Sequence, residues 1–81
     1  MSQKPETDGT LAELEIGTSA TIVGFVGDDV VSRRLFDLGF APGLTCELER
    51  RAPLGDPLMF TVGGTEIVLR RSEAARIQVT R

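Results

Sequence analysis

The sequence of 81 residues contains no histidine, tryptophan or tyrosine, and it has a single cysteine, Cys46. Without histidine the chain lacks the commonest general base, proton shuttle and metal ligand. One thiol can form neither an intramolecular disulfide nor a thiolate metal cage, and it suits a reducing compartment. No serine has a neighbouring base to activate it as a nucleophile. The sequence therefore predicts neither an enzyme nor a cofactor or metal site.

Long apolar runs are also missing from the sequence. No run approaches the ~18 residues of a membrane-spanning helix. The first eight residues, Met1 to Asp8, lack the apolar core of a signal peptide. We therefore expect a cytoplasmic protein that does not insert into a membrane.

The charge balance is acidic, with a formal net charge of −3, which argues against a general nucleic-acid binder. Lys4 is the only lysine, however, and six of the arginines occur in the pairs Arg33-Arg34, Arg50-Arg51 and Arg70-Arg71. Arginine is preferred where a planar group makes bidentate or stacked contacts. Some of these arginines are therefore candidates for contacts, whereas at least half are expected to be ordinary solvated side chains.

The N-terminal half predicts a tail, a strand and one helix. Residues 1–9 are polar and contain proline and glycine, which predicts a disordered tail in front of a domain over residues 10–81. Thr10 and Glu13 fit a capping box that starts a helical turn. The β-branched stretch 19–26 indicates a strand, and Asp29 is the expected N-cap of a helix over 30–38.

Within the expected helix, Val31, Leu35 and Leu38 are spaced to form one core-facing stripe. Phe36 lies roughly 130° away from that stripe, at about 100° per residue, and is either a second packing contact or an exposed anchor. Gly39 supplies the left-handed conformation that ends a helix, and Pro42 blocks its continuation.

The C-terminal half changes to an alternating pattern typical of strands. Leu44, Cys46 and Leu48 are expected to share one buried face. Gly63-Gly64 predicts a tight hairpin turn. The remaining expected elements are a proline-bounded turn at 52–57, strands at 58–62, 65–71 and 77–79, and an N-capped helical turn at 72–75. These patterns predict a mainly-β fold, a small antiparallel barrel with one inserted helix and a short helical turn before the last strand.

Three segments in this order resemble proteins of the FeoA family. The segment 33–43, RRLFDLGFAPG, is similar to the family's R-R-L-x-x-L-G-x-x-P-G helix and turn. The segment 52–57, APLGDP, resembles its A-P-L-G-D-P loop, and 69–77, LRRSEAARI, resembles its L-R-R-x-E-A-x-x-I ending. The resemblance extends from about Leu11 to the C-terminus and leaves only the tail outside.

The resemblance implies an SH3-like β-barrel and a cytosolic accessory protein of bacterial ferrous iron uptake. It also implies a partner, the FeoB membrane permease, whose cytosolic GTP-binding region the protein would contact. Through that contact the protein would modulate the assembly or activity of the permease.

The expected partner-binding residues are Arg33, Arg34 and Phe36, because arginine and exposed aromatics are enriched in interface hot spots. The loop residues Leu54, Gly55 and Asp56 are expected to face them and to complete the surface. An architectural role for the same loop is the alternative, since its prolines and glycine can simply fix a turn.

Three other interpretations stay open at this point. The first is an SH3-like regulatory or nucleic-acid-binding module related to the C-terminal domains of metal-dependent repressors. The second is direct Fe²⁺ handling by Asp28, Asp29 or Asp56, since carboxylates bind hard cations. The third is weak self-association through exposed strand edges, for which the sequence specifies no register.

Overall fold

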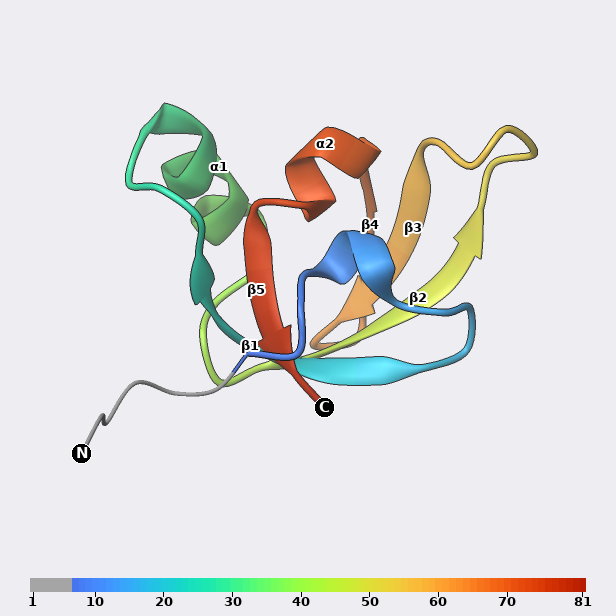
Figure 1. Ribbon diagram of the computed structural model, residues 1–81, viewed down its shortest axis with the longest axis horizontal. Coiled ribbons are helices and arrows are strands. Elements are labelled where there is room, and N and C mark those ends of the chain that lie inside the picture. Colours follow the sequence, from blue (N-terminus) through green and yellow to red (C-terminus); the bar gives the residue numbers. More distant parts are fainter. Residues whose placement is uncertain (1–6) are drawn as a thin grey trace.

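The computed structural model describes residues 7–81, which fold into one antiparallel sheet with one longer helix, α1, and a single-turn helix, α2 (Figure 1). The strands follow the order β4-β3-β2-β1-β5. This confirms the mainly-β fold expected from the sequence, including the inserted helix and the helical turn before the last strand. In chain order the elements are η1 (Leu11–Glu13), β1 (Ser19–Phe25), α1 (Val30–Leu38), β2 (Thr45–Arg51), β3 (Leu58–Val62), β4 (Thr65–Leu69), α2 (Arg71–Ala74) and β5 (Ile77–Thr80).

The β3–β4 hairpin is fixed by two glycines. Gly63 and Gly64 have φ angles of 57° and 84°. These left-handed values are what a type I′ turn requires at both central positions. Along β3, Leu58, Phe60 and Val62 are buried and the residues between them are not, as the alternating pattern predicted.

Strand β2 places Cys46 and Leu48 in the core, but Leu44 remains 40% exposed. The expectation that Leu44 shares their buried face was wrong. The strand begins only at Thr45, and the Leu44 amide instead donates to the carbonyl of Ala41, 3.2 Å away. Leu44 therefore belongs to the turn that leads out of the helix, and its side chain remains partly exposed.

Helix α1 has the boundaries that its capping residues predicted. The Asp29 carboxylate accepts a hydrogen bond from the Ser32 amide at 3.1 Å, which satisfies one of the free donors at a helix start. Gly39 ends the helix with a φ of 124°. Both ends of α1 are therefore fixed by nearby residues of the chain. Which face of the helix packs on the sheet is a separate question.

The buried face of α1 is centred on Ser32 and Leu35, and Leu38 is 42% exposed. The sequence stripe through Leu38 was therefore partly wrong, and Val31 is only partly buried. The expectation missed Ser32 because serine is polar. Its hydroxyl donates to the Gly27 carbonyl at 3.2 Å, so the side chain can be buried without losing a hydrogen bond.

The core is aliphatic around one aromatic pair. The rings of Phe40 and Phe60 meet edge to face, with centroids 6.2 Å apart, which is a favourable geometry for aromatic pairs. The Cys46 side chain belongs to the same core, as expected. The other buried apolar residues are Leu11, Ala12, Leu14, Ala20, Ile22, Leu35, Leu48, Leu58, Val62, Leu69, Ala74, Ile77 and Val79.

The segment before η1 is attached to strand β5. The Asp8 amide donates to the Val79 carbonyl at 2.7 Å, and the Val79 amide donates to the Gly9 carbonyl at 3.0 Å. The expected disordered tail at 1–9 therefore extends too far, because residues 8 and 9 cover the outer edge of β5. Residues 1–6 of that tail lie outside the described residues.

Helix α2 begins at Arg71, one residue before the expected start, and Ser72 is not its N-cap. The capping position belongs to Arg70, whose amide donates to the Glu73 carboxylate at 2.9 Å. An acidic residue three positions after the cap can thus replace a capping hydroxyl. α2 connects β4 to β5 and lies beside α1 at the top of the molecule (Figure 1).

Candidate partner-binding site

The two adjacent arginines of α1 lie on opposite flanks of the helix. Successive residues of an α-helix are about 100° apart, and Leu35 and Ser32 fix the buried face. Arg33 consequently lies on the flank beside the end of β1, whereas Arg34 lies beside α2 and forms an ion pair with Glu73. The structure therefore separates two residues that the sequence grouped together.

Arg33 and Phe36 line a groove between α1 and the end of β1, with a volume of about 480 Å³. We call it the α1 groove. Phe36 is 51% exposed, so it is not a fully packed side chain, and its role as an anchor stays a prediction. The residues that line the groove are Phe25, Gly27, Asp28, Ser32, Arg33, Phe36 and Asp37.

The loop that forms one wall of the α1 groove is tied to the end of α2. Arg76 donates to both carboxylate oxygens of Asp29 at 2.7 Å and, through Nε, to the Val26 carbonyl at 2.9 Å. This guanidinium and the Ser32 amide hold the pKa of Asp29 below its ordinary value. Gly27 adopts a φ of 85°, and a Cβ there would come within 3.0 Å of the Arg76 guanidinium. The bonds from Arg76 to Val26 and Asp29 therefore hold this wall of the α1 groove in place.

Arg34 and Asp56 line a second hollow, of about 700 Å³, which we call the α2 hollow. Asp56 has a structural role there, because its carboxylate accepts a hydrogen bond from the Arg71 amide at 3.0 Å. That bond fastens the 52–57 loop to the start of α2. The residues that line the hollow are Arg34, Asp56, Pro57, Val68, Arg70 and Glu73.

The tip of the 52–57 loop lies far from α1. Figure 1 shows the loop at one end of the long axis and α1 at the other, with α2 between them. Leu54 is 97% exposed, and Gly55 turns the chain with a φ of 90°. The expected facing arrangement of Leu54 and Gly55 with Arg33 and Phe36 is therefore absent, and only Asp56 approaches the α1 side.

Five groove residues were not expected from the sequence: Ser32 and Asp37 of α1, and Phe25, Gly27 and Asp28 ahead of it. The last three end strand β1 and lead into the helix, so the F-V-G-D-D stretch before Val30 is the signal that could have found them. From the sequence, this stretch was expected to hold a strand end, a helix cap and candidate Fe²⁺ ligands, and not one wall of a groove. A turn that must both cap a helix and follow a strand necessarily brings the strand end beside the first helical turn.

The acidic residues considered for Fe²⁺ binding are not gathered in one place. Asp29 is paired with Arg76, and Asp56 is bonded to the start of α2. Among residues 7–81, no group of three or more cysteine, aspartate or glutamate side chains is arranged to hold a metal ion. Desolvation in the core raises the pKa of the Cys46 thiol to about 12.

The described part of the chain also contains no helix that is long and apolar enough to cross a membrane. The surface of the described residues carries the α1 groove and the α2 hollow. The small antiparallel sheet of five short strands with an inserted helix places the fold in the class of SH3-like β-barrel modules. Within this class, residues 9–81 match the model of the FeoA domain, and the chain belongs to the FeoA family. The family and the fold expected from the three sequence segments are thereby confirmed.

The solved structures most useful for comparison are FeoA proteins. A FeoA-like protein from Clostridium acetobutylicum is 33% identical, with a TM-score of 0.85 over 93% of this chain and 87% of that one. FeoA of Stenotrophomonas maltophilia, solved with zinc and described as a procaryotic SH3 domain protein, is 39% identical, with a TM-score of 0.76. That alignment covers 86% of this chain and 87% of the other.

A curated relative places the same domain within a larger protein. The Fe(2+) transport protein A/Fe(2+) transporter FeoB fusion protein of Porphyromonas gingivalis is 38% identical over 69 residues, or 85% of this chain. This chain covers only 8% of the length of that fusion protein.

Proposed function

We propose that this protein is a cytosolic accessory protein of bacterial ferrous iron uptake that binds the cytosolic GTP-binding region of a FeoB-type permease. The observation that carries the proposal is the Porphyromonas fusion protein, in which a FeoA-like domain and a FeoB transporter form one polypeptide. Fusion keeps two domains at a high effective concentration. Such a fusion favours a working association between the two domains, and we extend that association to this chain.

The proposed contact on this side is the outer flank of α1, where Arg33 and Phe36 border the α1 groove. An exposed aromatic ring beside an arginine is the combination enriched in interface hot spots. Phe25 adds a second aromatic ring to the lining of the groove, against which a side chain of the partner could pack. Arg34 would act indirectly, since its ion pair with Glu73 joins α1 to α2.

The loop residues Leu54, Gly55 and Asp56 form a separate candidate contact. The loop tip lies at the opposite end of the molecule from α1 (Figure 1), whereas Asp56 lines the α2 hollow together with Arg34 of α1. A partner that touches only the α1 flank would leave Leu54 free, whereas a partner that spans the molecule would bury both regions. Substitutions at the two ends therefore report on the extent of the interface.

The test is co-purification of the full chain with the intact FeoB permease of the same organism in detergent. Arg33→Glu and Phe36→Ala should each weaken retention at least about tenfold, the effect of losing about 1.4 kcal/mol at an interface hot spot. Ile16→Ser is the matched exposed-residue control, because Ile16 is 52% exposed and lines neither the α1 groove nor the α2 hollow. Leu54→Ser tests separately whether the partner also touches the loop. Retention of the wild-type chain on FeoB is required, and undiminished retention of the α1 variants would move the contact elsewhere.

Modulation of the permease needs a separate measurement. The GTP hydrolysis rate of the permease and its iron uptake into proteoliposomes should change when the wild-type chain is added, and should not change with Phe36→Ala. Unaltered rates in a complex that still forms would restrict the role of this protein to assembly.

A further inference from the structure

The outer face of strands β2, β3 and β4 carries a row of three side chains in register. Arg50 of β2 lies opposite Met59 of β3, and Met59 lies opposite Val68 of β4. Residues directly opposite in an antiparallel sheet are the closest cross-strand neighbours. Val68 is 55% exposed and Met59 is partly buried. The row is thus an apolar surface that ends at a guanidinium group.

Two hollows border this row and share part of their lining. One, of about 190 Å³, lies over Arg50, Met59 and Val68, and the other is the α2 hollow. Pro57 and Val68 line both of them. The two hollows are therefore neighbouring parts of one surface, with Val68 as the apolar ridge between them. We call this surface the Val68 face.

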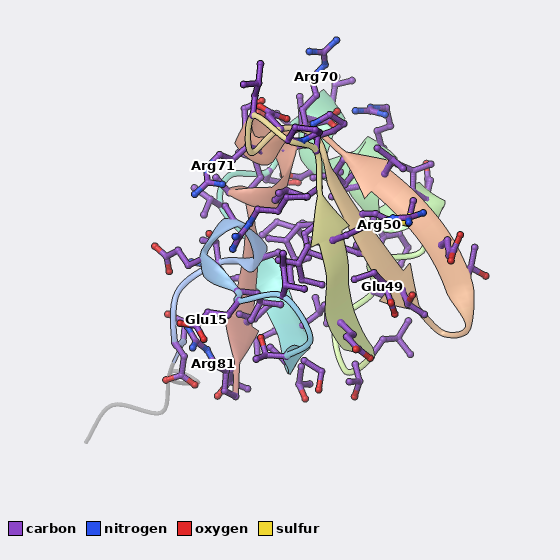
Figure 2. The ribbon with its side chains drawn as sticks, turned by 90° about the vertical axis from the view of Figure 1, so that its right-hand side faces the viewer. Glu15, Glu49, Arg50, Arg70, Arg71 and Arg81 are labelled. Atoms are coloured by element: carbon purple, nitrogen blue, oxygen red, sulfur yellow. The ribbon has the colours of Figure 1, made fainter. Side chains whose placement is uncertain are left out.

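The uncompensated charge on the Val68 face is positive, although the whole chain has a net charge of −3. Within residues 7–81, the side chains of Arg50 and Arg70 form no ion pair and donate no hydrogen bond. Figure 2 shows both side chains extending outward. The two guanidinium groups therefore remain available to a ligand.

The carboxylates of the Val68 face, by contrast, are already engaged. Asp56 accepts from the Arg71 amide, and Glu73 accepts from the Arg70 amide and pairs with Arg34. The nearby Glu49 accepts from the Thr61 hydroxyl at 2.8 Å. Glu73 is thereby neutralised by Arg34, whereas Asp56 and Glu49 keep their charge but form no ion pair with Arg50 or Arg70.

We infer that the Val68 face binds an extended acidic segment of a partner protein. The carboxylates of such a segment would pair with Arg50 and Arg70, because guanidinium and carboxylate groups form two parallel hydrogen bonds. An aliphatic side chain between the acidic residues would pack on Val68 and Met59. Only the identity of the partner as the permease depends on the proposed function; the surface itself does not.

The observations favour a protein segment over a nucleic acid. Single-stranded nucleic acids are held by aromatic side chains on which bases stack, and no aromatic residue lines either hollow of the Val68 face. An acidic peptide needs only two local pairings, one at Arg50 and one at Arg70, whereas a single-stranded nucleic acid needs a basic groove that follows its backbone.

The first experiment is an NMR titration of the full chain with a peptide of alternating glutamate and leucine, at low salt. The amide signals of Met59 and Val68 should shift, the shifts should disappear at high salt, and a lysine-for-glutamate peptide should produce none. Arg70→Glu should weaken binding of the acidic peptide about tenfold or more, since it replaces attraction by repulsion.

The matched control is Arg71→Glu, which introduces the same charge change on the next residue. The Arg71 side chain lines neither hollow and extends in a different direction (Figure 2). Arg71→Glu should bind the acidic peptide much more strongly than Arg70→Glu does. Equal losses in both variants would indicate a general charge effect and would overturn the inference.

Other outcomes are equally decisive. No shift at Met59 or Val68 with the acidic peptide overturns the inference whatever the permease does. Stronger shifts with single-stranded DNA than with the peptide would assign the face to nucleic acid instead. If the peptide binds as expected but the wild-type chain fails to bind FeoB, the proposed function fails and the Val68 face stands.

Discussion

Leu35→Ala is the substitution that tests most directly how α1 is held on the sheet. Leu35 is completely buried, whereas Leu38 on the same helix is 42% exposed. Truncating a buried leucine removes favourable transfer energy and leaves a cavity, at a cost of about 2–5 kcal/mol. For a domain of this size, each 1 kcal/mol lowers the Tm by about 4–8 °C. We therefore expect Leu35→Ala to lower the Tm by at least about 8 °C.

The Leu38→Ala variant is the matched control, because it removes the same atoms from an exposed position of the same helix. Its loss should stay below about 1 kcal/mol, since surface substitutions away from special features have small effects. Urea denaturation followed by far-UV circular dichroism gives both values with the m-value as a check on two-state behaviour. Equal destabilisation by the two variants would refute the assignment of the buried face of α1.

Three further predictions concern single polar or sulfur groups. Asp29→Ala should lower the Tm more than Asp29→Asn, because asparagine still caps α1, while Asp28→Ala should have little effect. Since the folded-state pKa of Asp29 is lowered, the stability difference between wild type and Asp29→Asn should be complete at neutral pH and vanish as the pH falls through that pKa. Cys46 should resist iodoacetamide at pH 8 until denaturant is added, because its pKa is about 12 and the thiolate is the reactive form; rapid native-state labelling would contradict its burial. Asp8→Ala should speed amide exchange in β5, because the Asp8 carboxylate binds the Thr80 hydroxyl and the Arg81 amide; unchanged exchange would show that this edge is held by the backbone alone.

The features that the sequence predicted correctly are those set by residues a few positions apart. Asp29 and Gly39 fix the two ends of α1 through their own side chain and backbone conformation. Gly63 and Gly64 fix the β3–β4 hairpin in the same way. In each case the energy that selects the structure is local, so no knowledge of the tertiary arrangement is needed.

The errors occur where distant elements decide the outcome. Leu38 fits a helical stripe, but the position of the sheet turns the buried face toward Ser32. Asp8 looks like part of a polar tail, and only the pairing with β5 shows otherwise. The separation of Leu54 from Arg33 likewise depends on α2 lying between the loop and α1, which no local pattern specifies.

The division of Arg33 from Arg34 changes which experiment can locate the interface. Reversing both charges is the natural test from the sequence, but Arg34 pairs with Glu73 and thereby links α1 to α2. In the double variant, the carboxylate introduced by Arg34→Glu would face the carboxylate of Glu73, and the repulsion would displace α1. A loss of binding could then follow from the displaced helix and not from a lost contact. Arg33 lines only the α1 groove. Arg33→Glu alone should therefore reduce FeoB binding with an unchanged Tm. Arg34→Glu should lower the Tm, and any loss of FeoB binding should accompany that loss of stability.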